Sequence, residues 1–188
     1  MYLVKKIPLK DLLIISPVKI QDTRGYFCEI WNQKEFSKIG INEKFVQDHR
    51  SFSKKKGTLR GLHYQTPPYT QSKLVRCNSG GILDIVVDVR NSSPTYGKWH
   101  SEKITFKNFK QIYVPSGFLH GFVTLEPNTE VLYKCTNYYN KKSEKIVLYN
   151  DPLLNINWEI NKKNIYVAKK DKQGQLFKKF KSNFKVKK

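Results

Sequence analysis

His63 carries the side chain best suited to acid–base chemistry in this sequence. It lies in TLRGLHYQ (58–65), a stretch that reads as a short strand. An imidazole has an unperturbed pKa of about 6.5, which suits proton transfer near neutral pH. Such a base usually pairs with a carboxylate that fixes its tautomer, and spacing alone does not identify that carboxylate. A satisfied core histidine or a surface histidine is the alternative interpretation.

A second histidine, His120, lies in PSGFLHGF (115–122). The pattern Pro-x-Gly-x-x-His followed by a strand resembles the second metal-binding motif of cupins. The first cupin motif needs His-x-His and a downstream Glu, but the corresponding place here reads LHYQ (62–65). One imidazole from each half is too few for a typical zinc or iron site. We therefore predict a cupin-like barrel without a metal, in which side chains do the chemistry.

Tyr133 and Lys73 could complement a histidine base. A tyrosine has a pKa near 10, so Tyr133 is protonated at neutral pH and can act as an acid beside a pocket. Lys73 can stabilise a developing oxyanion. The alternatives are a half-buried strand tyrosine and a solvated lysine at a strand end.

Alternation along strands predicts which residues share a face with these side chains. If those faces point into a barrel, His63, Tyr133 and Lys73 converge on an interior that can hold one small ligand. The neighbours on the same faces are Gly61 and Gln65 for His63, Val131 and Cys135 for Tyr133, and Val75 and Cys77 for Lys73.

Arginine is scarce, which draws attention to the places that keep it. Only five of the 35 cationic residues are arginines. The planar guanidinium suits bidentate binding of a diphosphate. Arg24 in DTRGYF and Arg60 in LRGLHYQ are the best candidates, and salt bridges within the fold are the competing explanation.

The elements that would position these residues are mainly strands. Apolar runs separated by turn signals favour an all-β barrel or sandwich. One helix is expected at 32–40, with Asn32 as N-cap and Gly40 past its end. A second short helix is expected around 175–184. The strand-like runs are KLVRC (73–77), ILDIVVDV (82–89), KITF (103–106), QIYV (111–114), GFVTL (121–125) and EVLYKCTNYY (130–139).

The length of the chain indicates a single domain, and its charge is strongly basic. The 188 residues carry a formal net charge of +20, and 161–188 hold eleven Lys and one Asp. Such a charge raises the hypothesis of nucleic-acid binding. The excess of Lys over Arg and the lack of a known nucleic-acid motif argue against it. The basic charge is explained by a solvated lysine surface, by attraction to a polyanion or an anionic membrane, or by attraction to an anionic small substrate.

The cysteines and the start of the chain bear on location. Three widely spaced cysteines, Cys28, Cys77 and Cys135, fit a reducing compartment better than a disulfide framework. The apolar run LLIIS (12–16) is too short for a signal sequence or membrane span. We therefore expect a cytoplasmic protein with no membrane or nucleic-acid partner.

Several segments, in order along nearly the whole chain, resemble the dTDP-4-dehydrorhamnose 3,5-epimerases, the RmlC type of nucleotide-sugar epimerase. The combination of RGLHYQ, KLVR and TNYYN is highly specific. The matching segments are 22–36, 45–53, 59–77, 88–99, 112–122, 132–144 and KKD at 169–171. The resemblance implies one RmlC-like cupin domain over 1–188, a jelly-roll barrel with a few short peripheral helices, ending in a lysine-rich extension at about 172–188.

The resemblance also implies a reaction and its residues. The substrate would be a nucleoside-diphospho-4-keto-6-deoxy sugar, whose keto group acidifies the protons at C3 and C5. His63 would be the base that removes one of these protons, and Asp171 the carboxylate paired with it. Lys73 would stabilise the oxygen of the enolate that forms, and Tyr133 would be the acid that returns a proton on the opposite face. No metal or organic cofactor is implied. The implied substrate contacts are His120, Arg24, Glu29, Gln47, His49, Arg60, Glu144 and Lys170, with Arg24 and Glu29 serving the site of the partner in a homodimer.

Two departures from the family pattern keep the substrate open. The family commonly reads Gln-Asp-Asn-His-Ser where this chain has QDHRS (47–51), so His49 replaces an asparagine at the sugar contact. The tail after Asp171 is also longer and more basic than expected. The alternatives are a GDP-linked sugar, a heptose, inversion at C3 only or C5 only, and a ketoisomerase or dehydratase. A non-enzymatic polyanion-binding protein is the alternative from another class, and surface polysaccharide synthesis is the expected role of an epimerase.

Overall fold

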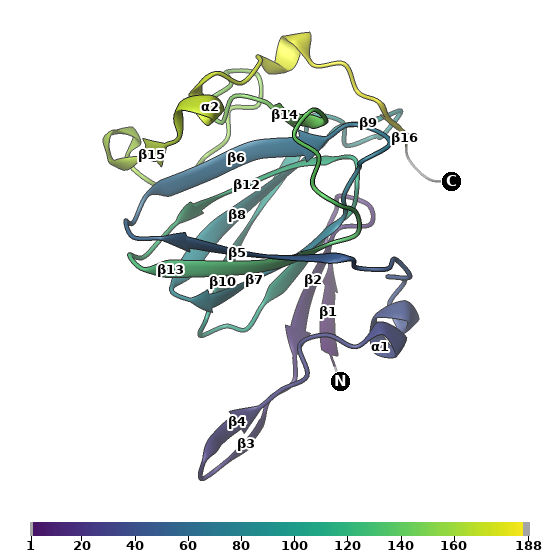
Figure 1. Ribbon diagram of the computed structural model, residues 1–188, viewed down its shortest axis with the longest axis vertical. Coiled ribbons are helices and arrows are strands. Elements are labelled where there is room, and N and C mark those ends of the chain that lie inside the picture. The colour runs from purple at the N-terminus through teal and green to yellow at the C-terminus, as the bar shows by residue number, and fades with distance from the viewer. Residues whose placement is uncertain (1, 186–188) are drawn as a thin grey trace.

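Two sheets that face each other form the body of the computed structural model, which describes residues 2–185 (Figure 1). The first sheet has six strands in the order β1-β2-β11-β7-β13-β5. These are β1 (Tyr2–Lys6), β2 (Leu13–Pro17), β11 (Gln111–Val114), β7 (Lys73–Ser79), β13 (Thr129–Cys135) and β5 (Gln47–Ser53).

The second sheet has the order β10-β8-β12-β6-β14, and β15 pairs with β6 in parallel. Its strands are β10 (Trp99–Thr105), β8 (Gly81–Asp88), β12 (Phe118–Thr124), β6 (Thr58–Gln65), β14 (Glu144–Ile146) and β15 (Tyr166–Val167). This arrangement confirms the all-β, cupin-type jelly-roll fold.

Two cores lie on the two faces of the second sheet. Val75, Val86 and Val131 belong to the core between the sheets. Val87 belongs to a second core on the outer face, with Trp158 from a later segment. Because both faces of β8 are covered, its whole length is buried, which explains the nearly unbroken apolar run GILDIVVD.

The first expected helix is confirmed as α1 (Gln33–Lys38). The Asn32 side chain accepts hydrogen bonds from the backbone N–H groups of Lys34 and Glu35, as an N-cap does. Gly40 follows the helix with a φ of +90°, a conformation that favours glycine.

The helix expected around 175–184 is wrong. That segment holds a short 3-10 turn, η2 (Phe177–Lys179), and then β16 (Phe184–Lys185), which pairs with β9 (Arg90–Asn91). Phe180 and Phe184 are buried in the outer core, so packing against the barrel determines the path of the tail. The tail therefore crosses the second sheet as part of the fold (Figure 1), and the last residues of the expected extension, 186–188, lie outside the described chain.

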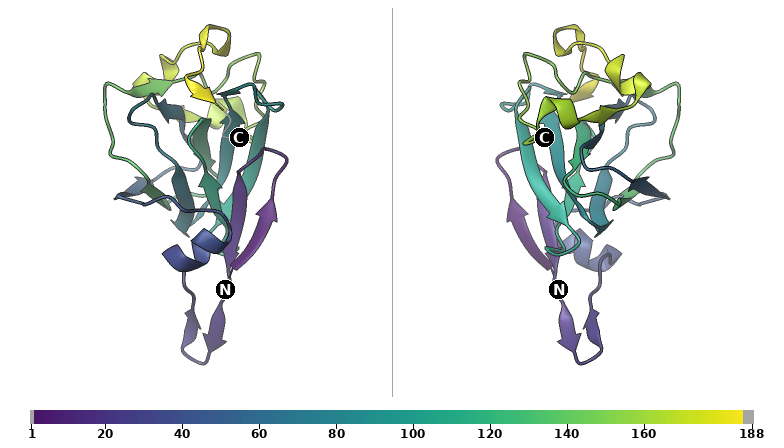
Figure 2. Two further views of the ribbon diagram at one scale, coloured as in Figure 1. Left: turned by 90° about the vertical axis from the view of Figure 1, so that its right-hand side faces the viewer. Right: turned by 90° about the vertical axis from the view of Figure 1, so that its left-hand side faces the viewer.

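The other small elements are peripheral. The hairpin formed by β3 (Ile20–Asp22) and β4 (Gly25–Phe27) projects away from the barrel as an arm, in both views of Figure 2. A 3-10 turn, η1 (Lys162–Asn164), precedes β15. The short helix α2 (Lys169–Lys172) contacts β6 and carries Asp171.

A bulge in β6 changes which of its residues face the barrel interior. His120 pairs with His63 and Phe122 with Arg60, so three steps along β6 match two along β12. The extra residue reverses the alternation. As a result Arg60 and His63 line the same pocket, although strict alternation predicts opposite faces.

Gly61 lies at this bulge with a φ of +134°. A Cβ atom there would lie 2.5 Å from the Cα of Gly121 and 2.9 Å from the carbonyl oxygen of His120. We predict that Gly61→Ala lowers the free energy of unfolding by about 2–4 kcal/mol, since a backbone clash adds to the strain of the positive φ. Urea denaturation measures this loss.

Gly25 provides the matched control. It has almost the same φ, +131°, but open space around the Cβ position. Gly25→Ala is therefore expected to cost only about 1 kcal/mol, from backbone strain alone. Equal losses in the two variants would contradict the close approach of β6 and β12.

Candidate active site

A cavity of about 640 Å3 opens between the two sheets, and most of the predicted site residues line it. Residues from both sheets and from α2 meet there. The bulge turns both Arg60 and His63 of β6 into the cavity, and the tail brings Asp171 to it. The predicted residues in its lining are Arg60, His63, Lys73, His120, Tyr133, Glu144, Lys170 and Asp171.

His63 and Asp171 form a close pair at this cavity. His63 Nε2 lies 2.8 Å from Asp171 Oδ1, and the Gly61 N–H donates to Asp171 Oδ2 at 3.2 Å. The carboxylate side chain is 2% exposed, whereas the imidazole is 22% exposed. The arrangement leaves His63 Nδ1 as the nitrogen that can accept a proton. One carboxylate thus holds both the imidazole and the bulge of β6.

The environment of Asp171 keeps it ionised. Burial raises the pKa of this carboxyl, but hydrogen bonds from His63 and from the Gly61 N–H outweigh burial and lower it below its usual value. An ionised carboxylate can stabilise the imidazolium that forms when His63 takes a proton.

The lowered pKa of Asp171 predicts a pH-dependent contribution to stability. A depressed folded-state pKa stabilises the fold above the unfolded value of about 3.9, and the contribution is lost as the pH falls through the folded value. The difference in free energy of unfolding between the native chain and Asp171→Asn should therefore shrink as the pH is lowered from about 6 to 3. A difference that grows on acidification would contradict the ionised state.

Tyr133 faces this pair from the first sheet. Burial raises the pKa of Tyr133 to about 12, so the phenol carries its proton at neutral pH. Lys73 Nζ lies 6.0 Å from the centre of its ring. Burial lowers the pKa of Lys73. A tyrosine and a lysine thus meet the His63–Asp171 pair inside one barrel.

His120 has a partner that the sequence analysis did not identify. His120 Nε2 lies 2.8 Å from Asp84 Oδ2, and the Asp84 side chain is fully buried. Asp84 Oδ1 is buried without a hydrogen-bond partner among the described residues. Asp84 is the single carboxylate within the apolar stretch ILDIVV (82–87), which was the available signal. It fixes the orientation of His120 at the cavity.

The mouth of the cavity is polar and aromatic. Lys170 Nζ donates to both oxygens of Glu144 at 3.1 Å. Arg60 donates to the carbonyl oxygen of Phe52 and remains exposed. Phe52 and Tyr166 are exposed aromatic side chains in the same lining. The sequence analysis singled out neither aromatic residue.

Gln47 and His49 lie on β5 beside the cavity but not in its lining. The Gln47 side chain accepts a hydrogen bond from the Tyr139 N–H at 2.9 Å. The His49 ring stacks on Tyr133, with 4.9 Å between ring centres. The structure therefore brings His49 into contact with Tyr133, the predicted acid.

Arg24 and Glu29 are outside the cavity of their own chain. Arg24, at the turn of the arm, pairs with Asp22 at 2.5 Å. Glu29 accepts hydrogen bonds from Tyr2 and Asn32. That these two residues contact the substrate in the active site of a partner subunit stays a prediction.

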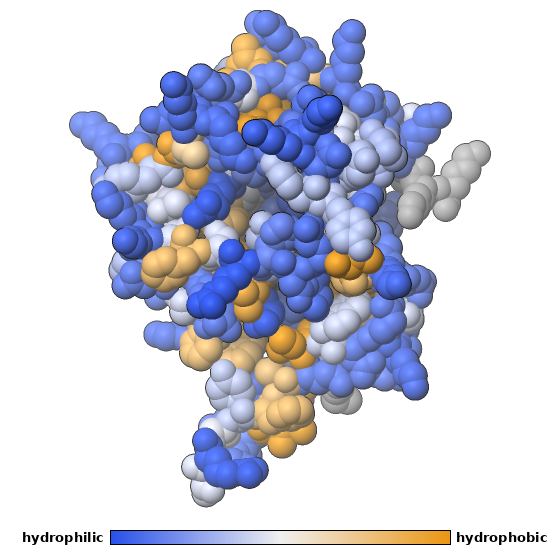
Figure 3. All heavy atoms as spheres, viewed as in Figure 1, coloured by the Kyte–Doolittle hydropathy of each residue, from blue (hydrophilic) through white to orange (hydrophobic). Residues whose placement is uncertain are grey.

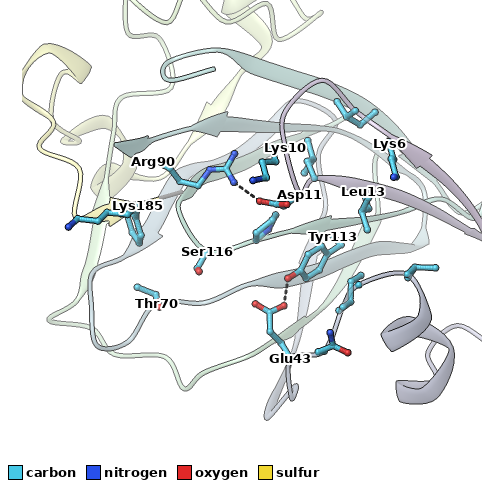
Figure 4. A pocket seen from close by; sticks show the side chains of 18 of the residues that line it. Lys6, Lys10, Asp11, Leu13, Glu43, Thr70, Arg90, Tyr113, Ser116 and Lys185 are labelled. Atoms are coloured by element: carbon cyan, nitrogen blue, oxygen red, sulfur yellow. Dashed lines mark hydrogen bonds and ion pairs between the residues drawn. The ribbon is translucent and has the colours of Figure 1, made fainter. Parts of the chain in front are cut away.

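A larger cavity, of about 780 Å3, lies between the β1–β2 turn and the tail. Its buried polar groups are already paired (Figure 4): Arg90 with Asp11, and Tyr113 with Glu43. It lacks the acid–base set of the smaller cavity, which is therefore the candidate active site.

The family model for dTDP-4-dehydrorhamnose 3,5-epimerase matches residues 6–179. The chain belongs to this family. A dTDP-4-dehydrorhamnose 3,5-epimerase of Shigella flexneri is 45% identical over 173 residues, which cover 92% of this chain and 94% of the relative. The epimerase described here is thus an isomerase that acts on carbohydrates.

Solved structures agree with this assignment. The dTDP-4-dehydrorhamnose 3,5-epimerase of Elizabethkingia anophelis is similar with a TM-score of 0.90 and 44% identity, covering 94% of the epimerase and 97% of that chain. The enzyme of Legionella pneumophila, solved with dTDP-4-keto-L-rhamnose, gives a TM-score of 0.91 at 37% identity, with 96% and 95% covered.

Two observations bear on metals and membranes. Within residues 2–185, no cluster of three or more His, Cys, Asp or Glu side chains is placed to hold a metal ion. Reaction without a metal or cofactor stays a prediction. No helix of the described chain is long and apolar enough to span a membrane.

Proposed function

We propose that this epimerase inverts C3, C5 or both in a dTDP-linked 4-keto-6-deoxy sugar, without a cofactor. The observation that carries the proposal is that the His63–Asp171 pair and the protonated Tyr133 line one cavity from different sheets. Inversion requires a base on one side of the carbon and an acid on the other. The solved relative from Legionella, with a dTDP-keto sugar bound, supports the substrate class.

The geometry suggests a sequence of steps. His63 Nδ1 takes the proton from the carbon next to the keto group, and the bond's electrons form an enolate. The Lys73 ammonium stabilises the negative enolate oxygen. Tyr133 then donates its proton to the opposite face of the carbon and becomes a tyrosinate. Solvent returns a proton to the tyrosinate and takes the proton from the His63 imidazolium, so both residues are restored. His120 contacts the sugar, and Arg60 binds the diphosphate.

Proton exchange tests the proposal directly. The protein is incubated in D2O with dTDP- and GDP-linked 4-keto-6-deoxy hexoses and heptoses, and C3 and C5 are followed by NMR. Label at both carbons supports a 3,5-epimerase, and label at one carbon identifies a single inversion. No exchange with any sugar, beside an active control epimerase, would refute the proposal.

The same experiment distinguishes the enzymatic alternatives. Exchange only with a GDP-linked heptose would move the assignment to that substrate, and a changed skeleton or loss of water would indicate a ketoisomerase or dehydratase. A polyanion-binding protein would instead be retained on heparin and lose retention when the exposed Lys178 and Lys179 are replaced by glutamine, which leaves the buried Phe180 and Phe184 of the tail in place. Cytoplasmic location and a role in surface polysaccharide synthesis are part of the proposal.

We further propose a homodimer in which each arm reaches the partner. Ile20 and Phe27 on the arm are each 68% exposed, and apolar side chains gather along the arm and its base (Figure 3). Such an exposed surface favours burial against another protein. A second copy of the chain places Arg24 and Glu29 near the partner's cavity, as the family resemblance implies.

We predict that Phe27→Asp shifts the protein from dimer to monomer in light scattering, because the interface would bury an unpaired charge. Leu153→Asp is the control, since Leu153 is equally exposed at 67% but lies away from the arm.

Mixing the inactive variants His63→Ala and Arg24→Ala should restore about a quarter of the activity through mixed dimers. No restoration would contradict arm exchange.

A further inference from the structure

His49 is placed directly against the acid of the proposed reaction. His49 and Tyr133 are opposite each other in the β5–β13 ladder. Their rings are nearly parallel, with 4.9 Å between centres and 16° between planes. Such a stacked pair restrains the rotation of both rings. The stack thus joins the predicted acid, Tyr133, to a residue predicted to contact the substrate, His49.

The surroundings keep the His49 ring neutral. Burial lowers the pKa of His49, and the nearby Lys73 cation lowers it further. Asp48, next along β5, opposes this effect, but its carboxylate pairs with Lys134 at 3.0 Å. A neutral imidazole adds a flat, polarisable surface beside the phenol without adding a charge.

We propose that His49 is a positioning residue for Tyr133, holding the phenol ring in the orientation from which it delivers a proton to the enolate. This inference rests on the proposed function. It assigns His49 an action through Tyr133, in place of the direct sugar contact that the family pattern implies. His49 replaces the usual asparagine, so the stack belongs to this chain's own version of the site.

His49 acts in the second half of the reaction, the protonation of the enolate. Once His63 holds the proton taken from carbon, the enolate has two fates. His63 can return a proton to the same face, which regenerates the substrate, or Tyr133 can donate to the opposite face, which gives the inverted product. A phenol that rotates freely donates less often. Loss of the stack should therefore change the partition between these fates while leaving proton removal intact.

The test compares His49→Ala, His49→Phe and the unchanged enzyme in D2O. NMR measures deuterium in recovered substrate and in inverted product. His49→Ala should lower the ratio of inverted product to labelled substrate by about three- to tenfold, the range of an aromatic pair. KM should stay within about twofold, since the sugar contacts remain. His49→Phe, which keeps a stacked ring, should recover most of the ratio.

Asp48→Asn is the matched control. Asp48 is the neighbour of His49 on β5, and its exposed carboxylate pairs with Lys134 away from the cavity, so its variant should leave the ratio unchanged. An independent readout is the ultraviolet titration of Tyr133, taken as the difference from Tyr133→Phe. His49→Ala should lower the pKa of Tyr133 towards its ordinary value because water gains access to the ring.

The outcomes separate the two proposals. No exchange in the unchanged enzyme would refute the proposed function itself. Normal exchange and inversion with an unaltered ratio in His49→Ala would overturn only the role of His49. A raised KM that His49→Phe does not restore would show direct sugar binding by the imidazole and would also overturn the positioning role.

Discussion

His63→Ala is expected to lower the rate of epimerisation by about 10^3-fold or more, and to abolish deuterium uptake from D2O. The variant removes the group proposed to take the proton from carbon, and general-base catalysis typically contributes about 10^2- to 10^4-fold. The imidazole is partly exposed at the cavity, but its loss leaves the buried Asp171 carboxylate without its side-chain partner, so the thermal unfolding temperature should fall by about 2–8 °C while the protein stays folded. NMR exchange and a melting curve measure the two effects.

Two further variants test the contribution of Asp171 and whether the loss of activity is specific to His63. Asp171→Asn keeps the imidazole but weakens its partner, so the expected loss is smaller, about 10- to 100-fold. His100→Ala is the matched control, because His100 is also a partly exposed histidine near a carboxylate, Glu102, at 3.5 Å. It lies on β10 outside the candidate active site. Exchange at the native rate in His63→Ala would refute the assignment of the base.

Tyr133→Phe should separate proton removal from inversion. Deuterium should still enter the recovered substrate at a rate within about threefold of the native one, because His63 is untouched, whereas inversion should fall by about 10^2-fold. The phenol oxygen is the only atom lost, and the ring can still stack on His49. NMR of both carbons against time measures the two rates.

A distant tyrosine shows whether the effect is specific. Tyr96 lies against Phe177 of the tail, so Tyr96→Phe should leave both rates unchanged. If Tyr133→Phe inverts the sugar at the native rate, another group is the acid. If it loses exchange and inversion equally, Tyr133 takes part in proton removal.

The barrel could be predicted from the sequence because its signals are local. Apolar runs and turn residues indicated the strands, and the side-chain oxygen of Asn32 marked the start of α1. The helix predicted around 175–184 was wrong because burial of Phe180 and Phe184 against the outer core determines the path of the tail. Local propensity gave way to tertiary packing there.

The site was predictable only in part. Alternation grouped Tyr133 with Val131, but the bulge at Gly61 brought Arg60 beside His63 against that rule. The pairing of His63 with Asp171 came from family resemblance, because no local pattern joins residues so far apart in the chain. Asp84 was missed because a carboxylate inside an apolar strand reveals its partner only once β8 and β12 are paired.

The position of Asp171 on the tail has a consequence for newly made protein. Both facing sheets, apart from the short β15, are encoded before residue 147, whereas the carboxylate that orients His63 follows later. Since a chain emerges from the ribosome N-terminus first, the strands that bear His63 and Tyr133 precede Asp171. A fragment that ends, or is cut by a protease, between β14 and α2 would retain His63 and Tyr133 but lack Asp171. Catalytic competence would then report that synthesis had run through the tail.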